Sequence, residues 1–183
     1  MDDKNGDGKP NDTWYEIKGS ESNNPETVKN YEVTYFKPQG NGNVKWSDNK
    51  GMSGELVPNF QSDSLWWSGY GNISSIKFSG VRLPNPYINS STQVGTENWF
   101  LHAGLFTSGY AECYNNSDYN SKLKANLMDI SSAVDGSGNL ANLSRIDFIK
   151  VQSGVFQIAG WLNEISTEIS GAADLRLLDK DSY

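Results

Sequence analysis

The sequence predicts an all-β fold, an antiparallel β-sandwich of jelly-roll-like type with long polar loops and at most one or two helical turns. Short segments rich in β-branched and aromatic residues recur about every ten residues, separated by Gly, Pro and Asn. Charged residues make up only 20% of the chain, whereas it holds 18 glycines and 9 tyrosines. This composition is more typical of a compact extracellular β domain than of a cytosolic enzyme.

The individual strands are predicted from alternation and from the turn residues at their ends. The strand-like segments are 13–18, 30–36, 44–46, 74–79, 99–103, 127–130 and 145–152. In the second of these, Tyr31, Val33 and Tyr35 alternate and therefore share one face. The apolar run 99–103 predicts a buried strand. The segment 145–152 is densest in β-branched residues and is the strongest strand prediction.

Between the strands lie long polar loops at 47–72, 84–98 and 112–125. Long loops on a rigid sandwich are usually where binding takes place, so we expect ligand contacts there. Helical character is thin, and single helical turns are expected at 130–135 and 170–175.

A chain of 183 residues fits one domain, which we place at 1–175 and follow with a solvated tail at 176–183. Cys113 is the only cysteine, so the chain forms no internal disulfide and no cysteine-rich metal site. No run of about 18 apolar residues occurs, so no membrane span is expected. Met1 is followed by two aspartates rather than by a basic and then an apolar segment. If the protein is exported, we expect this chain to be a mature, trimmed or partial form.

The charge balance is acidic, with 15 Lys and Arg against 22 Asp and Glu and a net charge of −7. No basic stripe is present in the sequence, which argues against nucleic-acid binding. An anionic membrane surface would repel such a chain. An acidic surface instead suits a soluble protein that binds cations.

The first twelve residues contain a regular series of oxygen-bearing side chains. Asp3, Asn5 and Asp7 occupy the first, third and fifth places of a D-x-N-x-D-G loop, and Gly8 falls in the sixth, where a Ca²⁺ loop turns sharply. The twelfth place holds Trp14 instead of glutamate, so the loop is not an EF-hand. The alternative is a flexible acidic terminus with plain Asn-Gly and Asp-Gly turns. The expected ligands of a structural Ca²⁺ are Asp3, Asn5, Asp7, the Lys9 carbonyl, Asn11, Asp12 and, from the far end of the chain, Glu168 or Asp174.

The segment Ser64–Gly71 places Trp66 and Trp67 side by side in a Gly- and Ser-rich setting. Neighbouring residues of an extended segment point to opposite faces, so one of the two tryptophans is expected to be exposed. An exposed ring there, with Tyr70 close by, would make a stacking platform for a sugar ring or a planar ligand. The alternative is that both tryptophans plug one end of the sandwich.

Candidates for catalysis are few. Glu164 and Glu168 lie four residues apart and could serve as acid and base in glycoside cleavage, although such pairs are more often solvated or bound to metal. His102, the only histidine, lies in an apolar run, which favours a hydrogen-bonded structural histidine over a base, a metal ligand or the axial ligand of a corrinoid cobalt. A Cys113–His102 nucleophile lacks an identifiable orienting group, and no common nucleophile, zinc or phosphate-loop motif occurs.

Several longer motifs resemble a signature of Bacteroidota-type secreted cell-surface proteins. They are Asp3-x-Asn-Gly-Asp-Gly-Lys-Pro-x-Asp-Thr-Trp-Tyr-Glu-Ile-x-Gly-Ser-Glu21, Tyr31-x-Val-Thr-Tyr35, Trp46-x-Asp-Asn-x-Gly51, Gly109-Tyr-Ala111, Ala133-Val-Asp-x-x-Gly-Asn139, Ile146-Asp-Phe-Ile-Lys-Val151 and Gly160-Trp-Leu-x-Glu-x-Ser-Thr-Glu-Ile-x-Gly-Ala172. Together they cover nearly the whole chain. Members of that family commonly have more sequence before the loop that begins at Asp3, so the resemblance implies that this chain lacks an upstream strand. The chain departs from that pattern at Asn59–Trp67, where the family carries His and Tyr-Tyr-Pro, and at Tyr110–Cys113, where it carries Tyr-Ala-Asp-Asn.

The resemblance implies an exported, non-enzymatic β-sandwich that accompanies outer-membrane nutrient uptake, including uptake of vitamin B12-type corrinoids. It implies a secreted or cell-surface location, a small-molecule nutrient as ligand and an outer-membrane uptake complex as partner. The ligand contacts expected in such a module are Trp66, Trp67, Tyr70, His102 and Tyr110.

We therefore predict a calcium-stabilised, non-catalytic surface module that captures a nutrient. The first candidate ligand is a corrinoid such as cobalamin, which rests on the resemblance. The second is a carbohydrate, which rests on the exposed-aromatic argument. The alternatives are a structural or adhesive domain of a larger surface protein, which would bind no small molecule, and a glycosidase that uses Glu164 and Glu168.

Overall fold

The computed structural model describes residues 1–57, 65–66, 69, 71–93, 97–112, 117–160 and 168–178. The chain separates into two compact units, each built from segments that are far apart in the sequence. The first unit comprises Met1–Asn24, His102–Ser153 and Ser166–Tyr183, and the second, called the sheet unit below, comprises Pro25–Leu101 and Gly154–Ile165. The assignment of 1–175 to one domain stays a prediction.

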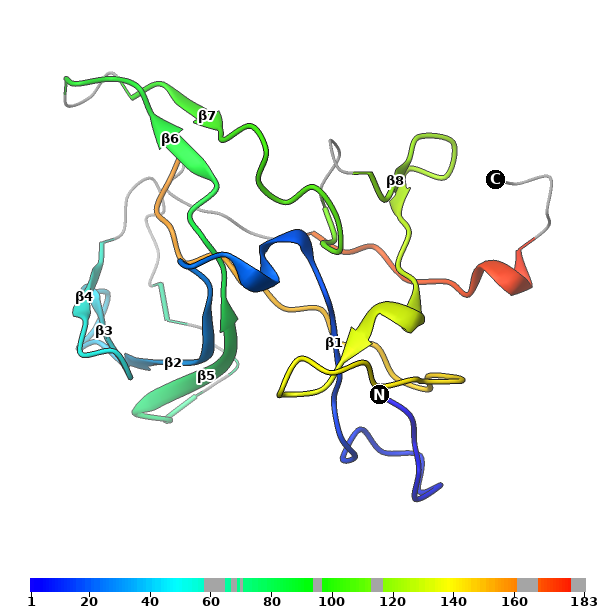
Figure 1. The fold of residues 1–183 in the computed structure, drawn as a ribbon. Coiled ribbons are helices and arrows are strands. Elements are labelled where there is room, and N and C mark those ends of the chain that lie inside the picture. The colour runs from blue at the N-terminus through cyan, green and yellow to red at the C-terminus, as the bar shows by residue number, and fades with distance from the viewer. Residues whose placement is uncertain are drawn as a thin grey trace. The chain divides into compact units, whose positions relative to one another are not determined.

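The described chain is mostly β, as the sequence predicts, and its helical segments are single 3₁₀ turns (Figure 1). The strands are β1 (Glu16–Ile17), β2 (Val28–Phe36), β3 (Val44–Asp48), β4 (Ser53–Leu56), β5 (Ser75–Arg82), β6 (Tyr87–Asn89), β7 (Trp99–Leu101), β8 (Tyr119–Asn120), β9 (Ala125–Asn126) and β10 (Ala133–Val134). The 3₁₀ turns are η1 (Ser20–Asn23), η3 (Ile130–Ser132) and η4 (Leu175–Leu177). Over the described ranges, no helix has the length and hydropathy needed to cross a bilayer.

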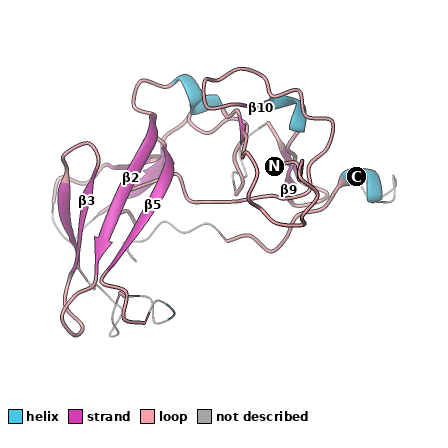
Figure 2. Ribbon diagram, turned by 90° about the horizontal axis from the view of Figure 1, so that it is seen from below, coloured by secondary structure: helices cyan, strands magenta, loops and turns pink. Residues whose placement is uncertain are grey.

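The strands form small antiparallel sheets. The largest has four strands in the order β4-β3-β2-β5, of which β3, β2 and β5 lie side by side in Figure 2. The other sheets are the two-stranded pairs β1-β10, β6-β7 and β8-β9. Pairing of β1 with β10 joins the start of the chain to residues 133 and 134, both of which are buried.

The four-stranded sheet has one apolar face. Tyr31, Val33 and Tyr35 alternate along β2 and share that face, which confirms the prediction from the sequence. Tyr35 lies opposite Trp46 on β3 and Ile76 on β5, so these side chains join the same face. The core of the sheet unit forms there, with Val44, Trp66 and Ile76 buried and Tyr35, Leu56 and Leu65 packed against them.

The opposite face of this sheet is polar. Thr34 on β2 lies opposite Ser47 on β3 and Lys77 on β5. The Lys77 ammonium forms an ion pair with the Glu32 carboxylate at 3.0 Å. A sheet with one apolar and one polar face needs cover on one side only, as antiparallel sheets commonly do.

Part of that cover comes from a segment late in the chain. The side-chain amide of Gln157 pairs with the backbone of Tyr87 in the manner of a neighbouring strand. Gln157 Oε1 accepts a hydrogen bond from the Tyr87 N–H at 3.1 Å, and its Nε2 donates to the Tyr87 carbonyl at 2.8 Å. The Leu83 N–H donates to the Gly154 carbonyl at 2.7 Å. These bonds hold residues 154–157 against the chain that follows β5.

The segment so held brings Phe156 onto the apolar face. The Phe156 ring meets Trp46 edge-on, with ring centroids 4.9 Å apart, and lies 6.1 Å from the Tyr31 ring. Gly54 on β4 is paired with Trp46, and a Cβ at Gly54 would lie 2.9 Å from the indole. Glycine is therefore required at that position for the indole to lie flat over β4.

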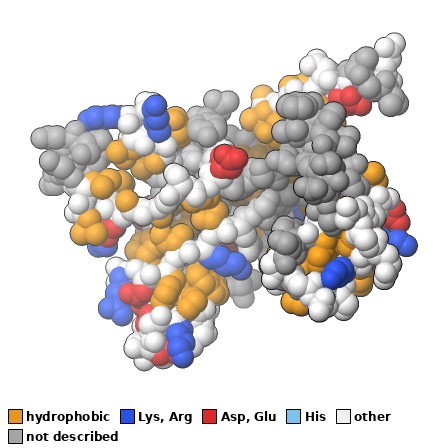
Figure 3. All heavy atoms as spheres, turned by 180° about the vertical axis from the view of Figure 1, so that it is seen from behind, with side chains coloured by type: hydrophobic (Ala, Val, Ile, Leu, Met, Phe, Trp, Pro, Cys, Tyr) orange, Lys and Arg blue, Asp and Glu red, His pale blue; other side chains and the backbone are white. Residues whose placement is uncertain are grey.

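The strand predicted at 145–152 is wrong. None of these described residues belongs to a strand, and the N–H groups of Asp147 and Phe148 donate instead to the Met1 carbonyl at 3.0 and 3.2 Å. Ile149 and Val151 are 60% and 45% exposed. Figure 3 shows hydrophobic side chains of the described chain on one face of the surface. β-Propensity reflects packing against a partner strand, and this segment pairs with none among the described residues.

Other segments also differ from the prediction. Residues 127–129 form no strand. The helical turn expected at 130–135 is present as η3, whereas the turn expected at 170–175 lies later, at η4. The buried strand expected at 99–103 is the shorter β7, and its Phe100 and Leu101 are exposed. Of the strand expected at 13–18, only β1 forms. The three long polar loops contain the short strands β4, β6 and β8.

Candidate functional site

The N-terminal loop folds around the carboxylate of Asp3. Asp3 Oδ1 accepts hydrogen bonds from the N–H groups of Gly6 at 2.9 Å and Asp7 at 3.2 Å, and Oδ2 accepts one from Gly8 at 2.8 Å. Gly6 and Gly8 both have φ of 72°, a left-handed conformation that glycine adopts without strain. The expectation of a sharp turn at Gly8 is therefore confirmed.

The other predicted ligands of the loop are engaged within it. Asn5 Oδ1 accepts from the Asp7 N–H at 2.9 Å, and Asp7 Oδ1 accepts from the Lys9 N–H at 2.9 Å. Asn11 Nδ2 donates to Asp7 Oδ2 at 2.9 Å, while the Asn11 N–H donates to the Lys9 carbonyl at 2.9 Å. Asp12 Oδ2 accepts from the Asn5 N–H at 3.4 Å. The six residues that the sequence assigned to the loop are thus joined by hydrogen bonds within it.

The loop is attached to a distant part of the first unit. The Asp3 N–H donates to Asp147 Oδ2 at 2.8 Å, and Arg145 Nε donates to Asp2 Oδ1 at 3.0 Å. The hydrogen bond from Arg145 lowers the pKa of Asp2 below its usual value, and the same contact raises the pKa of Arg145. The loop is thus placed by contacts to residues 145–147 as well as by its own turns.

The donor set of the loop suits calcium, because Ca²⁺ prefers carboxylate, amide and carbonyl oxygens. Over the ranges that the structure describes, however, no three Asp, Glu, His or Cys side chains are close enough to hold one ion together. The three aspartates of the loop therefore form no carboxylate cage as they stand. Amide, carbonyl and water oxygens would have to supply much of the shell.

The ligands expected from the far end of the chain have other contacts. The Glu168 N–H donates to Glu112 Oε2 at 3.0 Å, and the Asp174 carboxylate pairs with the Arg176 guanidinium at 2.6 Å. The hydrogen bond from Arg176 lowers the pKa of Asp174 to about 2. No hydrogen bond or ion pair in the described chain joins either carboxylate to the loop, so their part in a calcium shell stays a prediction.

Trp66 lies in the core of the sheet unit rather than on its surface. It is 9% exposed and packs in the cluster with Val44 and Ile76. A ring so covered offers no free face for stacking on a ligand. Trp66 is therefore the buried member of the tryptophan pair, while Trp67 and Tyr70 lie outside the described residues.

His102 and Tyr110 belong to the first unit, and both lie near Glu21. The Tyr110 hydroxyl accepts a hydrogen bond from the Glu21 N–H at 3.0 Å, and its ring meets Phe106 edge-on at 5.0 Å. The same ring fills the space that a Cβ at Gly19 would occupy. Tyr110 thus holds this region together. His102 is exposed.

Glu21 is a buried carboxylate that the sequence reasoning did not identify. It is 5% exposed, and its Oε1 accepts from Ser20 Oγ at 2.7 Å and the Phe106 N–H at 2.9 Å. Its Oε2 accepts from Asn24 Nδ2 at 2.9 Å. Burial alone would raise the pKa of Glu21, but these hydrogen bonds outweigh it and the pKa is lowered. The only sequence signal was an acid flanked by short hydrogen-bonding side chains.

The rival catalytic pair remains a prediction. Glu164 lies outside the described residues, so the structure gives no distance between its carboxylate and that of Glu168. The separation of the two carboxylates is what would decide between inverting and retaining glycoside cleavage.

Comparison with known proteins adds no relative. No protein-family model matches the chain, and no curated protein matches it. The resemblance of its motifs to secreted Bacteroidota-type proteins stays a prediction, and the function has to be argued from the residues themselves.

Proposed function

We propose that this chain is a non-catalytic, calcium-stabilised ligand-binding module of the cell surface, with its strands arranged as an antiparallel, jelly-roll-like sandwich. The observation that carries the proposal is the network of hydrogen bonds over residues 3–12. Three backbone N–H groups converge on Asp3, in a loop with the D-x-N-x-D-G spacing of calcium loops.

The loop still has oxygen lone pairs to offer. Each carboxylate oxygen can accept two interactions, and Asp3 Oδ2 accepts one hydrogen bond from within the loop. Asn5 Oδ1 likewise accepts one, from the Asp7 N–H. A cation bound among these oxygens would also relieve repulsion between the aspartates, which lie within ten residues of one another.

Calcium here would stabilise the unit that carries His102. The loop reaches Asp147 through the Asp3 N–H, so an ion that rigidifies the loop would also rigidify that attachment. In this proposal the ion is structural and takes no part in chemistry.

The first test is thermal unfolding in Ca²⁺, in Mg²⁺ and in EDTA. A ligand at about 100 times its Kd stabilises the folded state by about 2.7 kcal/mol. For a chain of this size this corresponds to a Tm increase of roughly 5–10 °C. We expect Ca²⁺ to produce the increase and Mg²⁺ to produce less of it, because Mg²⁺ requires stricter octahedral geometry.

Asp3→Asn tests the residue assignment, because the amide oxygen keeps one hydrogen-bond acceptor while the charge is lost. Asp135→Asn is the matched control: Asp135 Oδ1 also accepts two backbone N–H bonds, from Ser137 at 2.8 Å and Asn139 at 3.0 Å, outside the loop. The Ca²⁺ response should vanish in the first variant and persist in the second. Equal melting in Ca²⁺ and EDTA for the unmodified protein would refute the calcium assignment.

Ligand capture is tested with the calcium-loaded protein. A corrinoid is the first candidate, supported by the motif resemblance and by the exposed His102, whose imidazole is a suitable cobalt ligand. We expect cyanocobalamin to give saturable heat in a calorimetric titration, with weaker binding in His102→Ala. No heat would remove the corrinoid and leave a carbohydrate, for which Trp67→Ala should abolish binding with melting unchanged. A protein that captures a nutrient for an outer-membrane uptake complex does not modify it. The bound ligand should therefore be recovered chemically unchanged.

The glycosidase alternative has its own outcome. Turnover of a chromogenic glycoside that disappears in Glu168→Gln would overturn the non-catalytic assignment. Absence of binding to corrinoids and to a glycan panel would favour a structural or adhesive domain instead.

A further inference from the structure

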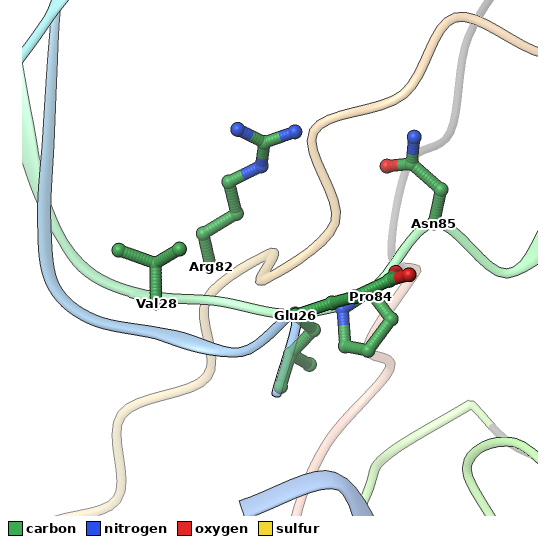
Figure 4. Close-up of a pocket in the computed structure, with 6 residues that line it drawn as sticks. Glu26, Val28, Arg82, Pro84 and Asn85 are labelled. Carbon is green, nitrogen blue, oxygen red and sulfur yellow. The ribbon is translucent and has the colours of Figure 1, made fainter. Parts of the chain in front are cut away.

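A small hollow of about 240 Å³ lies beside the end of β5 (Figure 4). Its walls are a guanidinium, a carboxylate, a carboxamide and three apolar side chains, contributed by Glu26, Val28, Arg82, Leu83, Pro84 and Asn85. All six residues belong to the sheet unit. Figure 4 shows Arg82 and Asn85 pointing in the same direction, on either side of Glu26 and Pro84.

The Arg82 guanidinium is positioned by two aromatic rings. Its Cζ lies 5.5 Å from the centroid of the Tyr31 ring and 5.6 Å from that of Phe156. Cation–π contacts of this kind fix a guanidinium without using its N–H donors. Within the described part of the chain, no hydrogen bond or ion pair engages the Arg82 side chain. Its five donors therefore remain available to a ligand.

A bulge in β2 explains why Arg82 reaches this place. Tyr31 pairs with Gly80 and Val28 pairs with Arg82, so β2 carries one more residue than β5 between these pairs. Asn30, within the bulge, has φ of 54°. Gly80 presents no side chain opposite Tyr31, and Arg82 is the next residue on the same face of β5. Bulges often re-aim a side chain beside a site.

The polar groups of the hollow specify the chemistry of its ligand. An unengaged guanidinium with a planar fork of donors matches a carboxylate, which it can bind through two parallel hydrogen bonds. Glu26 is an acceptor only, and its charge opposes an anion that brings no donors. The ligand therefore needs hydroxyl or amine donors beside its carboxylate. The apolar walls suit the C–H face of a ring.

We propose that this hollow binds an acidic sugar, one hexuronic acid residue, with its carboxylate on Arg82 and its hydroxyls toward Glu26 and Asn85. Drug-sized ligands occupy pockets of roughly 300–1,000 Å³, so a hollow of about 240 Å³ fits a single sugar ring. The site depends neither on the calcium loop nor on the corrinoid assignment, because its lining includes none of the residues named for either.

The test is a titration of the full chain, followed by NMR shifts or calorimetry, with methyl glucuronide and methyl galacturonide. Methyl glucoside and methyl galactoside are the neutral matches, and glycine represents a zwitterion that shares only the carboxylate and a donor. We expect at least one uronide to bind and both neutral sugars to bind at least about tenfold more weakly, because they lack the charge-assisted bond. Binding should weaken as salt is added.

Arg82→Gln should weaken uronide binding by roughly 10- to 100-fold, the loss expected for a hydrogen bond to a charged group. Lys77→Gln is the matched control, since Lys77 carries the same charge on the same strand but faces the opposite side of the sheet. Arg82→Lys keeps the charge without the fork and should also weaken binding. Circular dichroism and melting check that each variant is folded.

Several results would overturn the proposal. They are failure of both uronides to bind, equal binding of acidic and neutral sugars, and tighter binding of glycine than of either uronide. If Lys77→Gln weakened uronide binding as much as Arg82→Gln, the effect would be one of long-range charge and not of a direct contact with Arg82. None of these results would alter the calcium response of the N-terminal loop, so the two proposals fail separately.

Discussion

Glu21 offers a direct test of how the first unit is held together. In Glu21→Gln, the amide oxygen can still accept from Ser20 Oγ and the Phe106 N–H, but the new NH₂ group faces Asn24 Nδ2, donor against donor. One charge-assisted hydrogen bond is lost and two become neutral. Hydrogen bonds to charged groups contribute about 1.5–3 kcal/mol and neutral ones about 1 kcal/mol. The lower ends of these ranges, about 1.5 kcal/mol for the lost bond and about 0.5 kcal/mol for each bond that becomes neutral, give an expected loss of about 2–3 kcal/mol at pH 7.

The loss should depend on pH in one direction. The folded pKa of Glu21 lies below its ordinary value of 4.5, because hydrogen bonds outweigh the effect of burial. The unfolded state therefore takes up a proton first as the pH falls, and the stability contributed by the carboxylate is present above pH 4.5 and lost below it. The difference in free energy of unfolding between the two proteins should narrow as the pH falls through this range.

Amide exchange at Phe106 gives a local readout. A loss of about 2–3 kcal/mol corresponds to exchange of the Phe106 N–H roughly 30- to 150-fold faster if it opens with the unit. Glu55→Gln is the control, because the contacts of Glu55 lie at the surface: an ion pair with Lys45 at 3.8 Å and a hydrogen bond accepted from Asn43 Nδ2 at 2.9 Å. It should change stability by less than about 1 kcal/mol. Unchanged Phe106 exchange in Glu21→Gln, with the same pH dependence as the unmodified protein, would refute the reasoning.

Three further predictions concern packing and ionisation. Gly19→Ala should lower the free energy of unfolding in urea by about 1–3 kcal/mol, because the added Cβ would overlap the Tyr110 ring. Gly136→Ala, where the added Cβ faces open space, should have little effect. Phe156→Ala should lower the free energy of unfolding by about 2–4 kcal/mol, because its ring contacts in the sheet unit are lost. Phe36 is exposed, so Phe36→Ala should lower it by less than about 1 kcal/mol. Burial and the hydrogen bond to a carboxylate raise the pKa of Tyr31 to about 12, and burial also raises the pKa of Tyr35. Absorbance at high pH should therefore show phenols that ionise late, and the free energy of unfolding should fall above pH 10 because the phenols of the unfolded state ionise first.

The central strands could be predicted because their signal is local. Alternation in β2 depends on residues two apart, and the buried face of the sheet follows from it. The loop over residues 3–12 could be predicted for the same reason. Its turns are made by bonds between residues at most eight apart, such as the Gly8 N–H to Asp3.

What could not be predicted depends on partners far away in the chain. The segment 145–152 suits a strand in composition, but no neighbouring strand pairs with it in the described chain. Glu21 becomes a buried carboxylate only when Phe106, 85 residues later, supplies an N–H. Arg82 is held by Phe156, and the bulge that re-aims it has no clear signature beyond an asparagine at residue 30. The spacing of apolar and polar residues along the sequence does not identify any of these distant partners.

The late arrival of Gln157 has a consequence for how the protein is made. The sheet unit receives Phe156 only after the first 150 residues have been synthesised, since Gln157 and Gly154 fasten that segment to Tyr87 and Leu83. A nascent chain therefore cannot complete the packing of this unit until residues 154–157 have left the ribosome. Contacts between residues so far apart in the sequence slow folding. Until residues 154–157 are in place, the Trp46 and Tyr31 rings lack their contact with Phe156, and this face of the sheet is open to proteases and to aggregation.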